Sequence, residues 1–278
     1  MDFQDPALAN RLSLTAVGYN SSTGKWRTEA MRSHSSPRLL YIGKGQGRIT
    51  IAGLTRGYGP NNLIFIPART MYGFEVGPTV FGQMLTIPAA MAAEWPDEPV
   101  HLRLRDVLGQ KELAQLFDNL ERELVSARSG HSRAAHYHLG LLSVLFERQM
   151  DLQAEQEPAG KDRTTSAAAK LVAAYSDLVD RDFRSSKGVA EYAAALGVTP
   201  THLTRCCKQT CGKSALAILN DRTLFEARML LRQTRQPVQA IAANLGFTSP
   251  AYFSRAFHSA TGQTPSAFRR LGPIANPR

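Results

Sequence analysis

Cysteine is scarce in this sequence: the chain has three among 278 residues, and all three lie between Thr201 and Gly212. An odd number of cysteines crowded into one segment excludes a disulfide framework. Long apolar runs are also missing, because no stretch reaches the 18 residues that indicate a membrane span. The opening residues, MDFQDPALANR, lack the basic and apolar regions of a secretory signal. We therefore expect a cytoplasmic protein with no membrane segment.

Excess positive charge is absent from the first half of the chain. Residues 1–160 carry 16 basic and 16 acidic side chains, whereas residues 161–278 carry 17 basic and 7 acidic ones. The net charge of +10 therefore arises entirely in the second half. A basic segment joined to a neutral one is typical of a protein in which one part meets a polyanion. A basic domain that is merely soluble has the same composition, so charge alone leaves both interpretations open.

The first half changes its periodicity partway along. Residues 11–87 hold short apolar runs interrupted by many glycines, which predicts a small antiparallel barrel or sandwich. Residues 109–150 then have helical spacing of apolar side chains, with a second helix from about residue 132 to 150 that is apolar over a wide face. Such a helix buries itself against the strands or against a second copy of the chain. Residues 151–165 are polar and predict a linker.

The second half contains an internal repeat. One set of apolar and glycine residues recurs 49 residues later: Val189, Ala193, Leu196 and Gly197 return as Val238, Ala242, Leu245 and Gly246. Each copy predicts a helix, a glycine-containing turn and a second helix that starts with a capping residue and a proline, Thr199-Pro200 or Ser249-Pro250. The repeat therefore predicts two helix-turn-helix units, at about residues 186–210 and 237–260.

The repeat also bears on the cysteines. Cys206, Cys207 and Cys211 align with Ala256, Phe257 and Thr261, so the second copy keeps the pattern without sulfur. This favours a packing role on an apolar helix face. The alternative is a thiol or redox sensor built from the three cysteines.

The opposite face of each second helix is polar. In the first copy it presents Thr201, Thr204, Arg205 and Lys208, and in the second Ala251, Ser254 and Arg255, with Ser249 at the start of the helix. A helix fits the major groove of DNA, where these side chain types read base edges or phosphates. Simple solvation is the competing explanation for a polar face. The amphipathic segment between the copies predicts a rigid helix that would place two reading helices about one turn, roughly 34 Å, apart on DNA.

Residues 166–270 resemble the AraC/XylS family of bacterial transcription regulators. The segment EARMLLRQTRQPVQAIAANLGFTSPAYFSRAFHSATGQTPSAFRR is similar to the family signature over its length. The resemblance implies a DNA-binding domain at residues 166–272 in which the polar side chains named above face double-stranded DNA. Residues 1–150 resemble the cupin-like sensor domain of this family, which implies small-molecule binding and dimerisation through residues 109–150. It further implies a cytoplasmic, nucleoid-associated activator with RNA polymerase as a partner.

The resemblance also directs attention to an effector pocket in the barrel. Aromatic and basic residues of the strand region, with one methionine, are the candidates, and they suggest an aromatic or other organic acid as ligand. They are Arg38, Tyr41, Phe65, Arg69, Tyr72, Phe74 and Met84. Enzymatic cupins hold a metal with several histidines, but this region has only His34, with His101 at its margin. We therefore expect no metal, no cofactor and no catalysis, against the alternative of a metal-dependent cupin enzyme fused to a DNA-binding domain.

The sequence thus predicts an α+β chain. An N-terminal antiparallel β-barrel with following helices precedes an all-α domain, in which a linker helix joins the two helix-turn-helix units.

Overall fold

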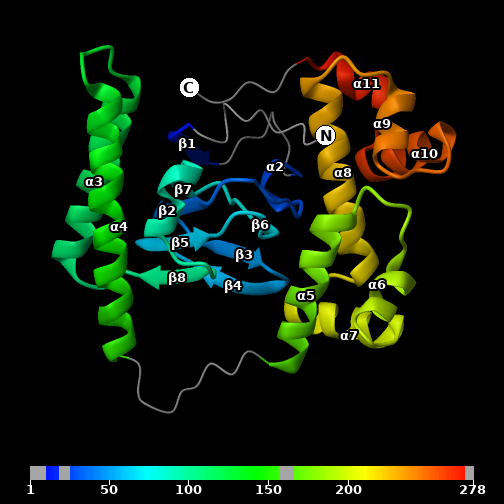
Figure 1. The fold of residues 1–278 in the computed structure, drawn as a ribbon, viewed down its shortest axis with the longest axis horizontal. Helices are drawn as coiled ribbons and strands as arrows, with labels where there is room; N and C mark the ends of the chain where they lie inside the picture. The colour runs from blue at the N-terminus through cyan, green and yellow to red at the C-terminus, as the bar shows by residue number, and fades with distance from the viewer. Residues whose placement is uncertain (1–10, 19–25, 157–165, 273–278) are drawn as a thin grey trace.

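The structure is a computed structural model that describes residues 11–18, 26–156 and 166–272. Its N-terminal part consists of antiparallel sheets flanked by two long helices, and its C-terminal part is helical (Figure 1). This arrangement confirms the predicted α+β fold class. Within the described ranges, no helix has the length and apolar character needed to cross a membrane.

Two antiparallel sheets form the N-terminal part, one of five strands in the order β1-β7-β2-β5-β8 and one of three in the order β4-β3-β6. The strands are β1 (Ser13–Gly18), β2 (Arg38–Lys44), β3 (Gly47–Ile51), β4 (Leu54–Tyr58), β5 (Asn62–Ile66), β6 (Tyr72–Phe74), β7 (Phe81–Thr86) and β8 (Val100–Arg103). The sheets face each other as a sandwich and do not close into the predicted barrel. The pairing of β2 with β7 shifts register between Ile42 and Lys44, and the chain then turns at Gly45, whose φ is 80°, into the second sheet. The bulge and turn therefore separate the sheets.

Strand β5 explains why the sheets need helices on their outer face. All five of its residues are buried. Leu63 and Phe65 point toward a core shared with the flanking helices, whereas Ile64 and Ile66 point into the space between the sheets. A strand that is covered on both faces has a continuous apolar sequence, which is what the run Leu63 to Ile66 shows.

Helices α3 (Val107–Val125) and α4 (His131–Gln156) cover the five-stranded sheet. Asp106 caps α3 by accepting a hydrogen bond from the backbone N–H of Gly109. Helix α4 runs six residues beyond the predicted end at residue 150, into the segment expected to be linker. Its buried face packs on the sandwich, so burial within the chain accounts for the apolar residues of that face. The rest of the expected linker, residues 157–165, lies outside the described residues.

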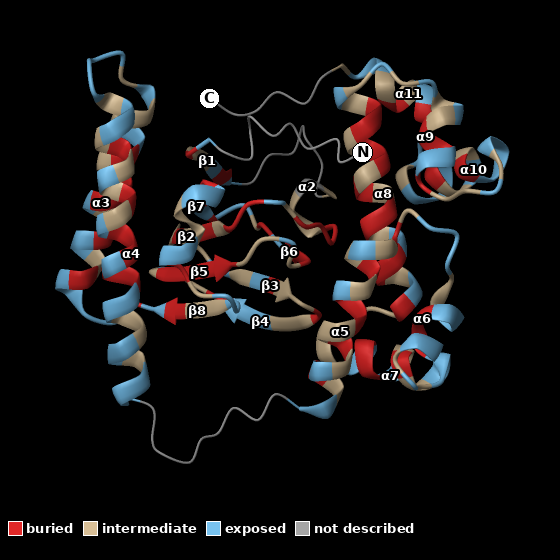
Figure 2. Cartoon of the chain, in the orientation of Figure 1, coloured by how far each residue is buried: buried red, intermediate tan, exposed pale blue. Residues whose placement is uncertain are grey.

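The C-terminal part is built around one long helix. Its elements are α5 (Ala167–Asp182), α6 (Val189–Ala195), α7 (Pro200–Cys211), α8 (Ala215–Gln233), α9 (Val238–Asn244), α10 (Pro250–Thr261) and α11 (Pro265–Arg270). Helix α8 joins the pair α6–α7 to the pair α9–α10 and packs against both, and much of it is buried (Figure 2). A single apolar cluster runs through both pairs, so they share one core.

The sandwich and the helical part pack against each other. Met31 and Met71, which belong to loops of the sandwich, are buried in the core of the helical part. Trp26, in the short helix α2 (Trp26–Glu29), contacts the rings of Phe225 and Phe268 with centroids 5.8 and 6.0 Å apart. Gly53, at the turn between β3 and β4, approaches α5 so closely that an added Cβ would lie 2.2 Å from Val172 Cγ1. The two parts therefore meet over an apolar contact.

Candidate nucleic-acid interface

The two predicted turns have nearly the same backbone geometry. Gly197 and Gly246 both have positive φ, at 69° and 76°. Each accompanies the same kind of hydrogen bond, in which Val198 donates to the carbonyl of Ala193 and Phe247 donates to the carbonyl of Ala242. Such bonds satisfy the last carbonyls of a helix, and glycine tolerates the left-handed conformation they require. The sequence repeat is thus a structural repeat.

The second helix of each unit also begins and ends in the same way. The side chain of Thr199 caps α7 and that of Ser249 caps α10, and a proline follows each cap. Gly212 and Gly262 end the two helices in the left-handed conformation. These local signals set the bounds of α7 and α10, which is why they could be predicted from the sequence.

The cysteines lie on the buried side of α7. Leu203, Cys206 and Cys207 are buried there, as Phe253 and Phe257 are in α10. A thiol takes less space than a phenyl ring, and the buried ring of Tyr175 from α5 belongs to the same apolar cluster as Cys206 and Cys207. The packing role predicted for these cysteines therefore has a physical basis.

Thiol chemistry is disfavoured at the same place. Burial raises the pKa of the Cys207 thiol to about 12 and also raises the pKa of Cys211. The reactive form of cysteine is the thiolate, which is scarce at neutral pH when the pKa is high. In the part of the chain that the structure describes, no group of three or more His, Cys, Asp or Glu side chains could hold a metal ion.

The polar faces of α7 and α10 point away from the core. Thr201, Arg205 and Lys208 are exposed on α7, and Thr204 is partly exposed. On α10, Ala251 and Arg255 are exposed and Ser254 is partly exposed. Ser249 differs from the other predicted readers, because its hydroxyl already accepts a hydrogen bond from the backbone N–H of Tyr252.

Two side chains of these faces were missed in the sequence. Tyr252 is 53% exposed on the first turn of α10, beside the predicted readers. Its equivalent in α7, His202, contacts Arg205, with its Nδ1 atom 3.0 Å from a guanidinium nitrogen. Each directly precedes the first buried residue of its helix, Phe253 or Leu203, and this place beside the apolar face was the signal available in the sequence.

Helix α8 sets the separation of the two polar faces. It has 19 residues and is therefore about 28 Å long at the usual rise per residue. Units at opposite ends of such a helix are separated by a distance comparable with one turn of DNA, roughly 34 Å. Figure 1 shows α7 near one end of α8 and α10 near the other.

The seven predicted effector residues do not share one cavity. Tyr41 and Phe65 face the helices, where the ring of Tyr41 lies 4.9 Å from that of Phe117. Of the seven, Tyr72, Phe74 and Met84 lie between the two sheets. Arg38 is half-buried and donates a hydrogen bond to the Thr86 hydroxyl. Arg69 is exposed and lines a pocket between the sandwich and the helical part.

The fold and the repeated interface define a protein that joins a β-sandwich to a double helix-turn-helix DNA-binding part. A family model described as "AraC-like ligand binding domain" matches residues 19–142, and one described as "Helix-turn-helix domain" matches residues 192–271. The chain belongs to the AraC family of transcription regulators.

Several relatives match only part of this chain. The arabinose operon regulatory protein of Escherichia coli (strain K12) is 29% identical over 154 residues, which are 55% of this chain and 51% of the relative. The right origin-binding protein of the same strain is 36% identical over 78 residues, covering 28% of this chain and 27% of the relative. The chain spans about half the length of the first of these relatives. Among solved structures, fatty acid-bound ToxT from Vibrio cholerae strain SCE256 is 14% identical, covers 96% of this chain and 97% of that chain, and has a TM-score of 0.45.

Proposed function

We propose that this protein is a sequence-specific transcription regulator in which α7 and α10 enter two major-groove boxes about one helical turn apart on one duplex. One observation carries the proposal: the two helices share caps, buried faces and exposed polar faces, with Arg205 and Arg255 at equivalent positions. The excess of basic residues in this half supports it. A single chain would then hold both reading helices.

A small organic effector would bind the N-terminal part and shift the balance between two arrangements of the chain. The domain border that we propose lies between Gln156 and Ser166, so that the end of α4 belongs with the sandwich. The resemblance described above supports an activator that works in the cytoplasm at the nucleoid and contacts RNA polymerase. Transcription from a selected promoter with purified RNA polymerase tests whether the protein activates or represses. A fall in the amount of transcript on adding the protein would contradict activation.

Replacing Arg255 by alanine is expected to lower discrimination between the selected DNA site and a site altered in the second box. A bidentate contact from arginine to guanine contributes about 1–3 kcal/mol of discrimination, so we expect roughly a fivefold to 150-fold loss. Arg205→Ala is expected to have the same effect on the other box. Competition binding at fixed salt, with each box altered in turn, measures both.

Lys208→Ala and Arg128→Ala serve as controls. A lysine–phosphate contact carries no sequence information, so Lys208→Ala is expected to weaken binding to all sequences alike. Arg128 lies in the exposed loop between α3 and α4, and its replacement is expected to change neither affinity nor discrimination. Unchanged discrimination in both Arg205→Ala and Arg255→Ala would contradict the assignment of the two readers.

We further propose that two copies associate through the outer face of α4. Tyr137, Leu141 and Val144 follow one stripe of this helix and are 68%, 56% and 40% exposed. An apolar stripe at this spacing matches the seam of paired helices. Leu141→Glu is expected to shift a dimer to monomer in sedimentation equilibrium, whereas Gln115→Glu on the neighbouring helix α3 leaves it unchanged. A wild-type chain that stays monomeric at high concentration would refute this interface.

A further inference from the structure

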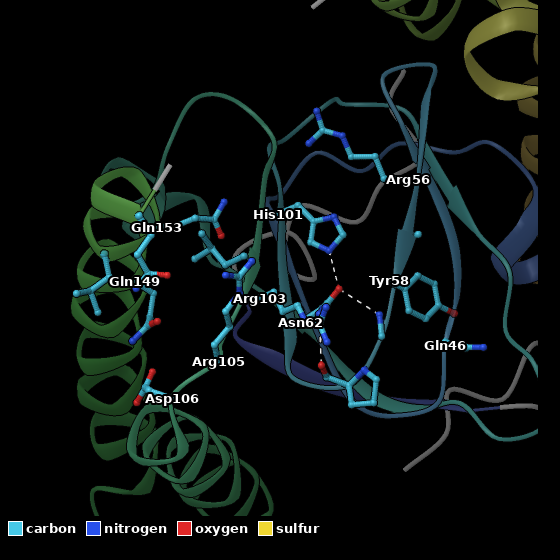
Figure 3. Close-up of a pocket in the computed structure, with 16 residues that line it drawn as sticks. Gln46, Arg56, Tyr58, Asn62, His101, Arg103, Arg105, Asp106, Gln149 and Gln153 are labelled. Carbon is cyan, nitrogen blue, oxygen red and sulfur yellow. Dashed lines mark hydrogen bonds between the residues drawn. The ribbon is translucent and has the colours of Figure 1, made fainter. Parts of the chain in front are cut away.

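A cavity of about 1060 Å³ lies at the edge of the sandwich, where β8 and β4 form the end strands of the two sheets (Figure 3). Its walls come from β4, from β8 and the segment that follows it, and from the last turns of α4. None of the seven predicted effector residues lines it. The sequence could not indicate it, because its walls are spread over more than 90 residues of the chain.

Positive charge dominates the lining. Three guanidinium groups, those of Arg56, Arg103 and Arg105, stand against one carboxylate, Asp106. That carboxylate already accepts a hydrogen bond from the backbone N–H of Gly109 as the cap of α3. Within the described parts of the chain, the side chains of Arg103 and Arg105 have no hydrogen-bond or ion-pair partner. Guanidinium groups bind carboxylates and phosphates in bidentate fashion, so this wall is suited to an anion.

The helix wall of the cavity is lined by amides. Gln149, Gln153 and Gln156 follow each other at spacings of four and three, which places them on one face of α4. A primary amide both donates and accepts hydrogen bonds, and so does a hydroxyl group. Figure 3 shows side chains from α4 and arginines from the strand side around the same cavity. The helix wall is therefore suited to a ligand that carries hydroxyl groups.

The floor of the cavity is held in a fixed arrangement. The buried Asn62 amide oxygen accepts hydrogen bonds from the backbone N–H of Gly59 and from Nε2 of His101, and its nitrogen donates to the carbonyl of Pro60. Because an amide oxygen only accepts, His101 must carry a proton on Nε2. Tyr58, the one six-membered aromatic ring of the lining, directs its hydroxyl to the carbonyl of Glu75. The lining therefore lacks the paired rings that an aromatic ligand would use for stacking.

We propose that this cavity binds a small hydroxylated organic anion, with its carboxylate or phosphate group on Arg103 and Arg105 and its hydroxyl groups on the α4 glutamines. A ligand held in this way joins the sheet edge to the last two turns of α4, just before residues 157–165. This inference deepens the proposed function, on which its regulatory meaning rests. Binding itself does not depend on whether the chain regulates transcription.

Isothermal titration calorimetry on the full chain tests the site with four probes at constant ionic strength: gluconate, glucose 6-phosphate, glucose and inorganic phosphate. We expect saturable one-to-one binding of gluconate or glucose 6-phosphate, and which of the two binds more tightly distinguishes a carboxylate site from a phosphate site. Glucose lacks the charge and is expected to bind at least tenfold more weakly. Inorganic phosphate lacks the sugar hydroxyl groups, so Gln153→Ala is expected to weaken binding of the organic anions and to leave phosphate binding unchanged.

Arg103→Gln and Arg105→Gln are each expected to weaken anion binding roughly tenfold to a hundredfold, which is the usual effect of losing a charge-assisted hydrogen bond. Both side chains are exposed, so the variants are expected to keep the wild-type unfolding midpoint. Arg128→Gln is the matched control and is expected to bind like the wild type. The proposal is overturned if neither organic anion binds at millimolar concentration. It is also overturned if both arginine changes leave the binding intact.

DNA binding by the same proteins separates this inference from the proposed function. Arginine-dependent anion binding by a chain that selects no DNA sequence would leave the site established and refute the regulator. Sequence-specific DNA binding by a chain that binds neither anion would refute the site and leave the regulator in place.

Discussion

Gly246→Ala is expected to destabilise the folded chain by about 2–5 kcal/mol, and Gly197→Ala by about 1–2 kcal/mol. Both glycines have positive φ, which costs about 1–2 kcal/mol in any residue with a Cβ. Only Gly246 is also crowded: an added Cβ would lie 2.6 Å from the carbonyl oxygens of Arg184 and Ser185. Those atoms are backbone and cannot rotate away, so overpacking adds about 1–3 kcal/mol.

Urea unfolding followed by circular dichroism measures the difference, with Gly197→Ala as the matched control. An added Cβ at Gly197 would meet no atom within 4 Å. The turn of the second unit is thus wedged against the connection between α5 and α6, which fixes the second unit relative to the first. Equal destabilisation by the two substitutions would show that this close approach is absent.

Arg222→Gln is expected to cost about 3–5 kcal/mol of folding free energy, because it removes one partner from a buried ion-pair network. Arg222 is 6% exposed, and its guanidinium group lies 2.9 Å from an oxygen of Asp180 and 2.9 Å from an oxygen of Glu226. It also lies over the ring of Phe183 at 3.9 Å. The Ser33 hydroxyl of the sandwich donates to the same Asp180 carboxylate, so the network reaches across the contact between the two parts.

Asp221→Asn is the matched control for Arg222→Gln, because Asp221 is the preceding residue of the same helix. Its ion pair with Lys213 is about one-third exposed, at 31% and 35% for the two side chains. Exposed pairs contribute about 0–1 kcal/mol. Denaturant titrations are therefore expected to show a larger loss of folding free energy for Arg222→Gln than for Asp221→Asn. A loss below about 1 kcal/mol for Arg222→Gln would contradict the importance of the network.

The same network predicts a pH dependence. Burial by itself would raise the pKa of the Glu226 carboxyl, but the guanidinium groups of Arg222 and Arg184 outweigh it, so the pKa lies below the ordinary 4.5. The stabilisation is complete above the pKa of the unfolded chain and is lost as the pH falls through the lower pKa of the folded chain. In Arg222→Gln the pKa of Glu226 is expected to rise. The free energy of unfolding of this variant is therefore expected to fall less than that of the wild type between neutral and acid pH. Urea titrations at several pH values measure this difference.

The helical half could be predicted from the sequence because its signals are local. A capping residue followed by proline starts α7 and α10, a glycine ends each, and apolar residues at helical spacing mark their buried sides. The repeat added a test that a single copy could not give, since the alignment of Phe257 with Cys207 is enough to indicate that both side chains pack in a core.

The sandwich was harder to predict because strand pairing joins residues that are far apart in the sequence. Which face a strand residue occupies depends on register, and a shift of one residue reverses it. Tyr41 and Phe65 therefore looked like pocket residues but face the helices, whereas Tyr72 faces the other sheet. The arginine-lined cavity was missed for the same reason, because tertiary packing alone brings Arg103 close to Gln153.

Selection from a random duplex library with the full-length protein, at stated salt, is the decisive experiment for two reading helices on one chain. We expect enrichment of two short boxes about one helical turn apart, with the first box lost in Arg205→Ala and the second in Arg255→Ala. Enrichment of a single box that neither substitution alters would contradict this arrangement.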